Sequence, residues 1–333
     1  MERVKVGVIG AGLWGVNHIE AYQGLAHAEV VAVADPVPGR AEEISKTFNI
    51  PHWFENHEDL CALKEIQAVS IVTSESEHLK PVEAAAKAGK HILVEKPVAY
   101  SVAEVEKMIA AARQADVILM PGHLLRFETR YALIKEMLNN HELGAIASIQ
   151  ARRNRTKGNF KKYGRAHPIF AVAVHDIDIL LWYAQSKVRR VRGYHRSVQG
   201  AATPDLVWGI IEFSSGAMGI IETTWLTPDA VGVFSNDSLQ LITDKGIARL
   251  ELVDGGLSFW LESGLLVPDT IAPRIRGHVV GALAAELSYF LACVINGEKP
   301  QVVTAEEARD GIEVAVALVE SATQDREVVL ASS

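Results

Sequence analysis

Val4-Lys5-Val6-Gly7-Val8-Ile9-Gly10-Ala11-Gly12-Leu13-Trp14-Gly15 is the stretch that decides the fold of the first part of the chain. Its first six residues form a nearly continuous apolar run, which is typical of a β-strand buried on both faces. The last six have the spacing Gly-x-Gly-x-x-Gly and lead into a helical pattern. A glycine-rich turn between a buried strand and a helix predicts a Rossmann-type dinucleotide-binding unit.

Each position of this turn has a predicted role. Gly10 permits the tight turn, Gly12 lets the backbone approach a pyrophosphate, and Gly15 lets the helix lie close to the sheet. Leu13 and Trp14 lie between them, where the helix opens and its unpaired N–H groups attract phosphate. We therefore predict that Gly10, Gly12, Leu13, Trp14 and Gly15 bind the cofactor.

The second predicted strand ends in Asp35, 25 positions after Gly10 (35 − 10). A carboxylate at this position accepts hydrogen bonds from the hydroxyls of the adenosine ribose and repels a 2′-phosphate. The nearest basic residue that follows it is Arg40. The sequence therefore favours NAD over NADP, with Asp35 as a cofactor-binding residue.

Short apolar runs alternate with helical patterns through the first third of the chain. Strand, helix and strand repeated in this way require a parallel sheet with right-handed crossovers. We predict an α/β protein in which residues 1–122 form an NAD-binding Rossmann domain with a doubly wound parallel sheet. The predicted strands are Val4–Ile9, Val30–Ala34, Ala68–Thr73, His91–Val94 and Val117–Met120, and the predicted helices are His18–His27, Arg40–Phe48, Glu77–Gly89 and Ala103–Ala115, the last capped by Ser101.

The pattern of alternating predicted strands and helices ends after Gly122. Strand-like segments then follow one another with few helices between them, punctuated by Gly, Asp, Asn and Pro, which predicts antiparallel pairing. Residues 123–333 are therefore predicted to form an α+β substrate-binding and oligomerisation domain with a large, mainly antiparallel sheet. The predicted strands are Ile146–Thr156, Val188–Gln199, Leu206–Phe213, Ala217–Trp225, Ser238–Thr243, Ile247–Leu252 and Leu257–Glu262, and the predicted helices are Arg126–Asn139, Phe170–Tyr183, Val279–Ile295 and Ala305–Ser321.

Composition excludes some classes of partner. The 333 residues are 49% hydrophobic and 22% charged, with a formal net charge of −8, so a nucleic-acid partner is not expected. The densest basic run, residues 152–165, fits either a solvated strand edge and loop or a site for an anionic or polyhydroxylated small molecule. No apolar run is long enough to cross a bilayer, and no signal peptide precedes the first strand. Cys61 and Cys293 lie in apolar patterns, so we expect buried free thiols and a cytoplasmic protein.

Two further segments give the chain a recognisable signature. Val94-Glu95-Lys96-Pro97 follows a predicted strand, and Val174-His175-Asp176-Ile177-Asp178 lies in a predicted helix. Together with the glycine-rich turn, they resemble the Gfo/Idh/MocA oxidoreductase family, which includes glucose-fructose oxidoreductase, inositol 2-dehydrogenase and nucleotide-sugar dehydrogenases. The resemblance covers nearly the whole chain.

The resemblance implies roles for individual residues. Lys96 matches the lysine near the nicotinamide and the substrate hydroxyl, and Pro97 matches a proline that shapes the backbone there, often through a cis bond. His175 matches the histidine usually cast as the acid/base. The remaining positions that the resemblance assigns to cofactor binding are Thr73, Ser74, His78, Glu95 and Arg126.

One position departs from the inositol-type members of this family. Those members carry an aspartate four residues before the histidine, where this chain has Ala171. The change removes a carboxylate that would orient the imidazole and bind a substrate hydroxyl. An inositol-type site is therefore in doubt, although other branches of the family lack that aspartate.

The residues themselves suit alcohol oxidation. Removing a hydroxyl proton while a hydride leaves requires a base, for which Lys96 and His175 are suited. Alternation along the predicted strand places Gln150, Arg152 and Asn154 on one face, and we predict that Arg152 and Asn154 bind substrate beside Lys96 and His175. Each of these residues also fits an ordinary structural role. We predict no metal site, because His175 and Asp178 lack a convincing third ligand.

Three functions remain open from the sequence. The first is an NAD(H)-dependent oxidoreductase acting on a sugar, a sugar derivative or a cyclitol. The second is an NAD-dependent glycosidase that oxidises one ring carbon transiently, and the third is a cofactor-binding regulator without turnover. Apolar residues such as Ile220 on the exposed face of the sheet predict a homo-dimer or homo-tetramer.

Overall fold

The computed structural model describes residues 3–231, 235–251, 257–262 and 264–330. Contacts divide the chain into two units: residues 1–128 with 269–310, and residues 129–268 with 311–333. The boundary predicted at residue 122 was based on the change from alternating strands and helices to successive strands. The contacts place the division at residue 128 and also assign residues 269–310 to the first unit. Among the predicted strands, the final residue of 247–252 lies outside the described residues.

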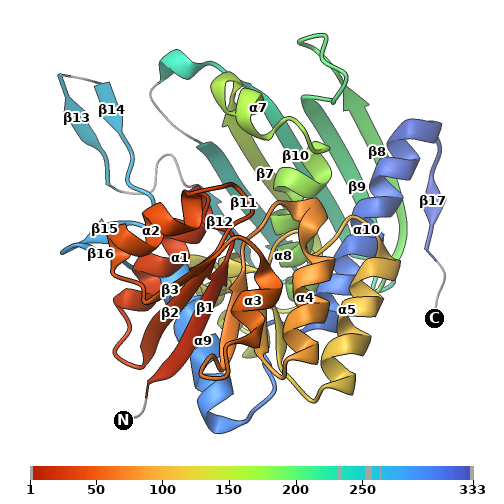
Figure 1. The fold of residues 1–333 in the computed structure, drawn as a ribbon. Helices are drawn as coiled ribbons and strands as arrows, with labels where there is room; N and C mark the ends of the chain where they lie inside the picture. The colour runs from red at the N-terminus through yellow and green to blue at the C-terminus, as the bar shows by residue number, and fades with distance from the viewer. Residues whose placement is uncertain (1–2, 232–234, 252–256, 263, 331–333) are drawn as a thin grey trace. The chain divides into compact units, whose positions relative to one another are not determined.

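The first unit contains a six-stranded parallel sheet in the order β3-β2-β1-β4-β5-β6. This confirms the predicted doubly wound sheet, of which β1, β2 and β3 are labelled in Figure 1. The order reverses between β1 and β4, where open α/β sheets place their ligands. The strands are β1 (Val4–Ile9), β2 (Ala28–Ala34), β3 (His52–Phe54), β4 (Ala68–Ile71), β5 (His91–Glu95) and β6 (Leu119–Gly122).

The predicted helices of this unit are present, most of them with shifted ends, and α3 was not predicted. The first helix begins at Leu13, five residues before the predicted start at His18 (18 − 13), because the glycine-rich turn itself opens it. The Ser101 side chain accepts a hydrogen bond from the N–H of Glu104, which is the predicted cap. The helices are α1 (Leu13–Gln23), α2 (Arg40–Phe48), α3 (His57–Ala62), α4 (Leu79–Lys87), α5 (Val102–Gln114) and α9 (Ala282–Asn296), with short 3₁₀ turns η1 (Glu75–Glu77) and η2 (Leu124–Phe127) and a hairpin of β15 (Arg274–Ile275) and β16 (His278–Val279).

The core of the first unit joins distant parts of the chain. Val6 and Val8 of β1 and Ile19 of α1 belong to one buried cluster with Leu287 and Phe290 of α9. Helix α9 therefore completes the Rossmann layer rather than the second sheet. The thiols of Cys61 and Cys293 are buried and free, as predicted, and burial raises the pKa of the Cys61 thiol to about 11.

The second unit contains a seven-stranded sheet in the order β12-β11-β7-β10-β9-β8-β17. Its pairs are antiparallel except for β7 and β10, which run parallel. The prediction of a mainly antiparallel sheet is confirmed, and the parallel pair is explained by the long crossover between those two strands. The strands are β7 (Ile146–Thr156), β8 (Val188–Arg196), β9 (Leu206–Phe213), β10 (Met218–Thr227), β11 (Ser235–Thr243), β12 (Ile247–Glu251) and β17 (Val328–Val329), with a separate hairpin of β13 (Phe259–Leu261) and β14 (Gly264–Leu266).

Helices pack on one face of this sheet, and apolar side chains are exposed on the other. A Cβ added at Gly219 would lie 2.7 Å from Leu180 Cδ2, which shows how closely the helix that carries Leu180 approaches the strand. The helices are α6 (Thr129–Asn139), α7 (Lys157–Tyr163), α8 (Val174–Ala184) and α10 (Ala305–Gln324), whose first turns belong to the first unit, with one 3₁₀ turn, η4 (Asp229–Val231). We call the opposite side the exposed sheet face, and its exposed apolar residues on β8, β9 and β10 are Tyr194, Trp208, Ile210, Met218 and Ile220.

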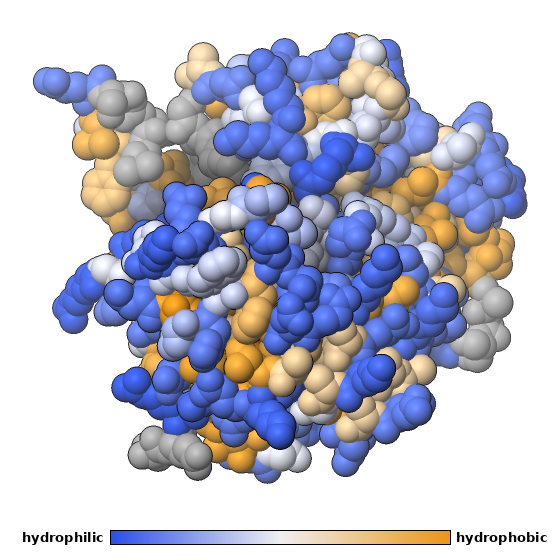
Figure 2. All heavy atoms as spheres, in the orientation of Figure 1, coloured by the Kyte–Doolittle hydropathy of each residue, from blue (hydrophilic) through white to orange (hydrophobic). Residues whose placement is uncertain are grey.

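Hydrophilic side chains cover most of the surface drawn in Figure 2. Across the part of the chain that the structure describes, every helix is too short or too polar to cross a membrane.

Candidate active site

The glycine-rich turn has the geometry of a phosphate cradle. Gly10 has φ = 106°, and a Cβ there would lie 2.4 Å from the carbonyl oxygen of Val72 on the neighbouring strand end. Only glycine fits this combination of backbone angle and close approach.

The other two glycines differ from each other in what surrounds them. No described atom lies within 4 Å of a Cβ built at Gly12, so the space above this residue is open. A Cβ at Gly15 would lie 1.9 Å from the carbonyl oxygen of Gly10. Among the described contacts, no side chain caps the start of α1, which leaves its first N–H groups available to a phosphate. The turn therefore fits the pyrophosphate of a dinucleotide.

Asp35 lies at the end of β2, next to this turn. Its Oδ2 accepts a hydrogen bond from the N–H of Ala11 at 2.8 Å, and its Oδ1 accepts one from Val37 at 2.9 Å. The Arg40 guanidinium lies 3.4 Å from the same carboxylate. A carboxylate offers about four acceptor positions, so Asp35 keeps capacity for ribose hydroxyls while it holds the turn.

Lys96 follows β5 in a turn that is held from both sides. The Lys96–Pro97 peptide bond is cis, and Lys96 is half-buried. Before it, Glu95 Oε2 accepts a hydrogen bond from the N–H of Lys96 at 3.0 Å. After it, His78 Nδ1 lies 3.0 Å from the carbonyl oxygen of Pro97 and 3.1 Å from that of Val98.

His78 therefore supports the lysine turn from the neighbouring strand end. Burial lowers the pKa of its imidazole, although the backbone carbonyls around it act in the opposite direction. Both ring nitrogens face carbonyl oxygens, Nδ1 those of Pro97 and Val98 and Nε2 that of Thr73 at 3.3 Å, and the neutral ring donates to one side at a time. His78 was predicted as a cofactor-binding residue, and these contacts give it a role in shaping the turn.

Thr73 and Ser74 lie in the turn after β4. Thr73 Oγ1 donates to the carbonyl oxygen of Glu77, and Ser74 precedes the 3₁₀ turn η1. Strand β4 lies between β1 and β5 in the sheet, so this turn shares the carboxyl edge with the glycine-rich turn and with Lys96. Eight predicted positions thus meet at one edge: Gly10, Gly12, Gly15, Thr73, Ser74, Glu95, Lys96 and Pro97.

Arg126 has partners within its own unit. Its side chain is 1% exposed, and Nη1 donates to the carbonyl oxygen of Val302 at 2.8 Å and to Glu307 Oε2 at 2.9 Å. These bonds tie η2 to the segment that follows α9. A role for Arg126 in cofactor binding remains a prediction.

His175 lies in the first turn of α8. The residues before it, Ile169–Ala173, form a π-helical turn where the sequence predicted ordinary helix. Such turns occur frequently at functional sites. His167, Ala171 and His175 are half-exposed, whereas the residues between Ala171 and His175 are buried, so these three positions form the accessible stripe of this segment.

The residue after His175 is part of a buried ion network that the sequence did not reveal. Arg153 donates through Nε and Nη2 to Asp176 at 2.9 to 3.1 Å, and through Nη1 to Asp237 at 2.8 Å. Arg155 also bonds to Asp237, and the Tyr131 hydroxyl lies 3.3 Å from Arg153. We call these five residues the Arg153 cluster.

The Arg153 cluster holds α8 against the sheet. Burial alone lowers the pKa of the Arg153 guanidinium, but the carboxylates of Asp176 and Asp237 raise it far above its usual value, so Arg153 stays charged. The sequence contained a signal for this cluster. Arg153 occupies an inward-facing position of a strand, and a buried cation there requires buried carboxylates.

Arg152 and Asn154 lie on the opposite face of β7 from Arg153. Arg152 contacts Asn236 at 3.3 Å, and Asn154 donates to Glu222 Oε1 at 3.0 Å. Because strand side chains alternate, these two residues do not share the face on which α8 carries His175. The structure thus does not bring them to His175, and their role in substrate binding remains a prediction.

Comparison with known proteins identifies the family. Residues 4–123 match the family model described as an oxidoreductase family with an NAD-binding Rossmann fold, and residues 131–249 match the GFO/IDH/MocA C-terminal domain. The chain belongs to the Gfo/Idh/MocA oxidoreductase family. The predicted membership is confirmed, and NAD is the cofactor of this Gfo/Idh/MocA protein.

Curated relatives of this Gfo/Idh/MocA protein extend over almost its full length. It is 27% identical to scyllo-inositol 2-dehydrogenase (NAD(+)) of Bacillus subtilis, over 96% of this chain and 94% of the relative. It is 24% identical to D-apiose dehydrogenase of Paraburkholderia graminis, over 100% of this chain and 91% of the relative. Among solved structures, scyllo-inositol dehydrogenase from Lactobacillus casei with bound NAD(H) and scyllo-inositol has a TM-score of 0.86 at 21% identity, over 98% of this chain and 99% of that one. This last likeness supports the fold.

Proposed function

We propose that this protein is an NAD(H)-dependent dehydrogenase that oxidises a secondary alcohol of a sugar, a sugar derivative or a cyclitol. The observation that carries the proposal is the Lys96 turn. Glu95 and His78 hold it on both sides at the edge of the sheet that also carries the glycine-rich turn. The names of the curated relatives, which include inositol and apiose dehydrogenases, support the substrate class.

The residues divide the work as follows. Bound NAD⁺ supplies the hydride acceptor. The glycine-rich turn and the open N-terminus of α1 hold the pyrophosphate, and Asp35 accepts hydrogen bonds from the adenosine ribose. Lys96 binds and polarises the reacting oxygen, and His175 removes the hydroxyl proton.

The substrate class follows from what the second unit offers beside His175. Ala171 supplies no carboxylate, so a substrate hydroxyl that an aspartate would bind lacks that partner here. We therefore favour a sugar or sugar derivative over inositol. No observation in the described part of the structure specifically favours the two alternatives, a glycosidase or a regulator without turnover.

Purified protein tests the proposal directly. NAD⁺ reduction is followed by absorbance across a panel of aldoses, sugar acids, amino sugars and cyclitols, with calorimetry for NAD⁺ binding. We expect Lys96→Ala and His175→Ala each to lower kcat by roughly 10²–10⁴-fold while NAD⁺ affinity is mostly kept. Absence of NAD⁺ binding, or turnover unchanged in both variants, contradicts the proposal.

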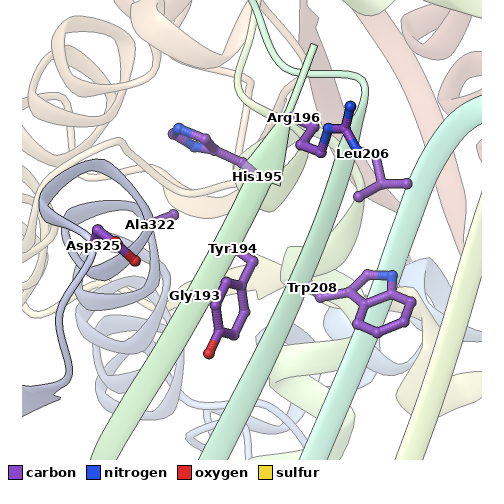
Figure 3. A pocket seen from close by; sticks show the side chains of 8 residues that line it. All are labelled: Gly193, Tyr194, His195, Arg196, Leu206, Trp208, Ala322 and Asp325. Atoms are coloured by element: carbon purple, nitrogen blue, oxygen red, sulfur yellow. The ribbon is translucent and has the colours of Figure 1, made fainter. Parts of the chain in front are cut away.

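We also propose that the protein forms a homo-dimer or homo-tetramer through the exposed sheet face. Tyr194 and Trp208 are cross-strand neighbours and are 47% and 52% exposed. Both line a cavity of about 500 Å³, and Figure 3 shows them on neighbouring strands. Ile210 and Ile220 continue the apolar area, and they are flanked by charged pairs of both signs such as Arg190–Glu212. A self-complementary patch of this kind suits a two-fold interface.

Light scattering coupled to size-exclusion chromatography measures the assembly. We expect a dimer or tetramer for the wild type and a monomer for Trp208→Glu, while Trp260→Glu, on the β13–β14 hairpin, serves as the exposed-tryptophan control. A monomeric wild type at micromolar concentration contradicts this part of the proposal. We place the protein in the cytoplasm on the strength of its two buried free thiols, and cell fractionation tests that placement.

A further inference from the structure

One side of α1 carries a column of rings through the first unit. Trp14, His18 and Tyr22 are spaced by four residues, so they lie on one face of the helix. Their ring centroids are 6.2 Å and 6.5 Å apart, in edge-on contact. His18 and Tyr22 are fully buried, and Trp14, which lies within the glycine-rich turn, is half-buried.

Two of these rings, those of Trp14 and His18, form hydrogen bonds to the carboxylate of Glu95. Glu95 Oε1 accepts hydrogen bonds from Trp14 Nε1 at 2.8 Å and from His18 Nε2 at 3.1 Å. Its other oxygen accepts the bond from the N–H of Lys96. We call Trp14, His18 and Glu95 the Glu95 cluster. Three hydrogen bonds converge on this one carboxylate, and through it the phosphate-binding turn is linked to the backbone of the lysine turn.

The neighbouring strand leaves room for this arrangement. Gly122 of β6 pairs with Glu95 across the sheet, and a Cβ at Gly122 would lie 3.1 Å from Glu95 Oε1 and 3.3 Å from its Cα. Any larger side chain would press on the carboxylate. The position of Glu95 is therefore fixed from the helix side and from the sheet side.

The carboxylate remains charged in this buried place. Burial raises the pKa of the Glu95 carboxyl, but the hydrogen bond and charge of His18, with contributions from Lys96 and Trp14, lower it below its ordinary value. Among the described residues, His18 Nδ1 has no hydrogen-bond partner, so the polar contact of this ring is directed to Glu95. An ionised Glu95 needs donors on both oxygens, and His18 supplies one of them.

We propose that His18 is a positioning residue for Lys96. It holds the Glu95 carboxylate in the orientation that fixes the Lys96 backbone, and Trp14 joins the same carboxylate to the turn that receives the cofactor phosphates. Trp14 and the Lys96 backbone thus share one buried carboxylate. This inference rests on the proposed function, because it takes Lys96 as the residue that contacts the substrate oxygen.

Replacement of His18 by side chains with and without a donor tests the inference. His18→Leu removes the donor, and we expect kcat to fall by about ten- to a hundredfold with little change in the KM for NAD⁺. His18→Gln keeps an N–H donor of similar reach and is expected to retain most of kcat. Tyr22→Phe is the matched control, because Tyr22 shares the column but bonds to Ser70 at 2.7 Å rather than to Glu95. It is expected to lower stability and leave kcat unchanged.

Crystal structures of wild type and His18→Leu give a readout that does not need turnover. We expect the bond between Glu95 Oε2 and Lys96 N to be lost and the lysine turn to move in His18→Leu. A superimposable turn, a kcat equal to that of the wild type, or an equal loss in the Leu and Gln variants overturns the inference. Failure of the wild type to oxidise any substrate would instead count against the proposed function, while the crystallographic comparison would still decide the role of His18.

Discussion

The two units each bury a charged cluster next to a predicted catalytic residue, but they do so in different ways. In the first unit, the Glu95 cluster holds one carboxylate with an indole and an imidazole, beside Lys96 in a turn. In the second, the Arg153 cluster joins two arginines and two aspartates beside His175 on a helix. The first holds a turn, and the second fastens a helix to a sheet. We therefore expect damage to the first to appear in turnover and damage to the second to appear in stability.

Breaking the Arg153 cluster gives the largest expected effect. Arg153→Met leaves Asp176 and Asp237 buried without their central cation, and we expect a loss of about 3–5 kcal/mol in the free energy of unfolding. Urea denaturation followed by circular dichroism measures it. Arg152→Met, one residue away on the opposite face and half-exposed, is the matched control, with an expected loss below about 1 kcal/mol. Equal losses of unfolding free energy in the two variants would contradict the stabilising role that we assign to the Arg153 cluster.

Acid should weaken the second unit through His167. Burial and the nearby His195 lower the pKa of His167 to about 4 from its ordinary 6.5, and its Nδ1 accepts a bond from the N–H of Ile169 at the start of the π turn. Since the unfolded state takes up the proton first, the contribution is complete above pH 6.5 and is lost as the pH falls toward 4. The expected loss is at most about 3 kcal/mol. His167→Asn should flatten this dependence, and an unchanged slope between pH 4 and 6.5 would contradict it.

Removing Asp35 tests the cofactor end of the first unit. Asp35→Ala takes away the ribose acceptor and the bond to Ala11, so we expect NAD⁺ affinity to fall roughly ten- to a hundredfold, from the usual strength of hydrogen bonds to charged groups. The preference for NAD⁺ over NADP⁺ should narrow, because Arg40 is freed from the carboxylate. Calorimetry with both nucleotides measures this, with Asp59→Ala on α3 as a control. Unaltered NAD⁺ affinity would exclude Asp35 from the site.

Restoring the missing aspartate gives the smallest expected effect. Ala171 lies on the half-exposed stripe with His175, so Ala171→Asp places a carboxylate where a substrate hydroxyl is expected. We expect activity toward inositol to rise by about tenfold relative to other polyols, the equivalent of one hydrogen bond. Ala184→Asp, at the other end of α8, is the control. An equal loss of activity toward all substrates would contradict the prediction that this stripe contacts the substrate.

Local signals were sufficient for much of the first unit. The β1 strand, the φ > 0 glycine after it and the carboxylate at the end of β2 each depend on residues close together in sequence. The strand bounds of β1, β7 and β9 also agree with the predicted ones, because their apolar patterns are long and regular. The short elements β3 and α3 escaped prediction, since three to six residues carry too little periodicity.

The sequence by itself determined the parallel Rossmann sheet, the phosphate-binding turn and the family, because these depend on backbone requirements that particular residues meet in a row. Tertiary structure alone decided that β7 and β10 run parallel, that Arg153 pairs with Asp176, and that His18 reaches Glu95. Each of these depends on partners that lie 23 to 77 positions apart, or on strands that pair across a long crossover. Burial then makes such pairings obligatory, since a charge removed from water must find its partner wherever the chain has placed it.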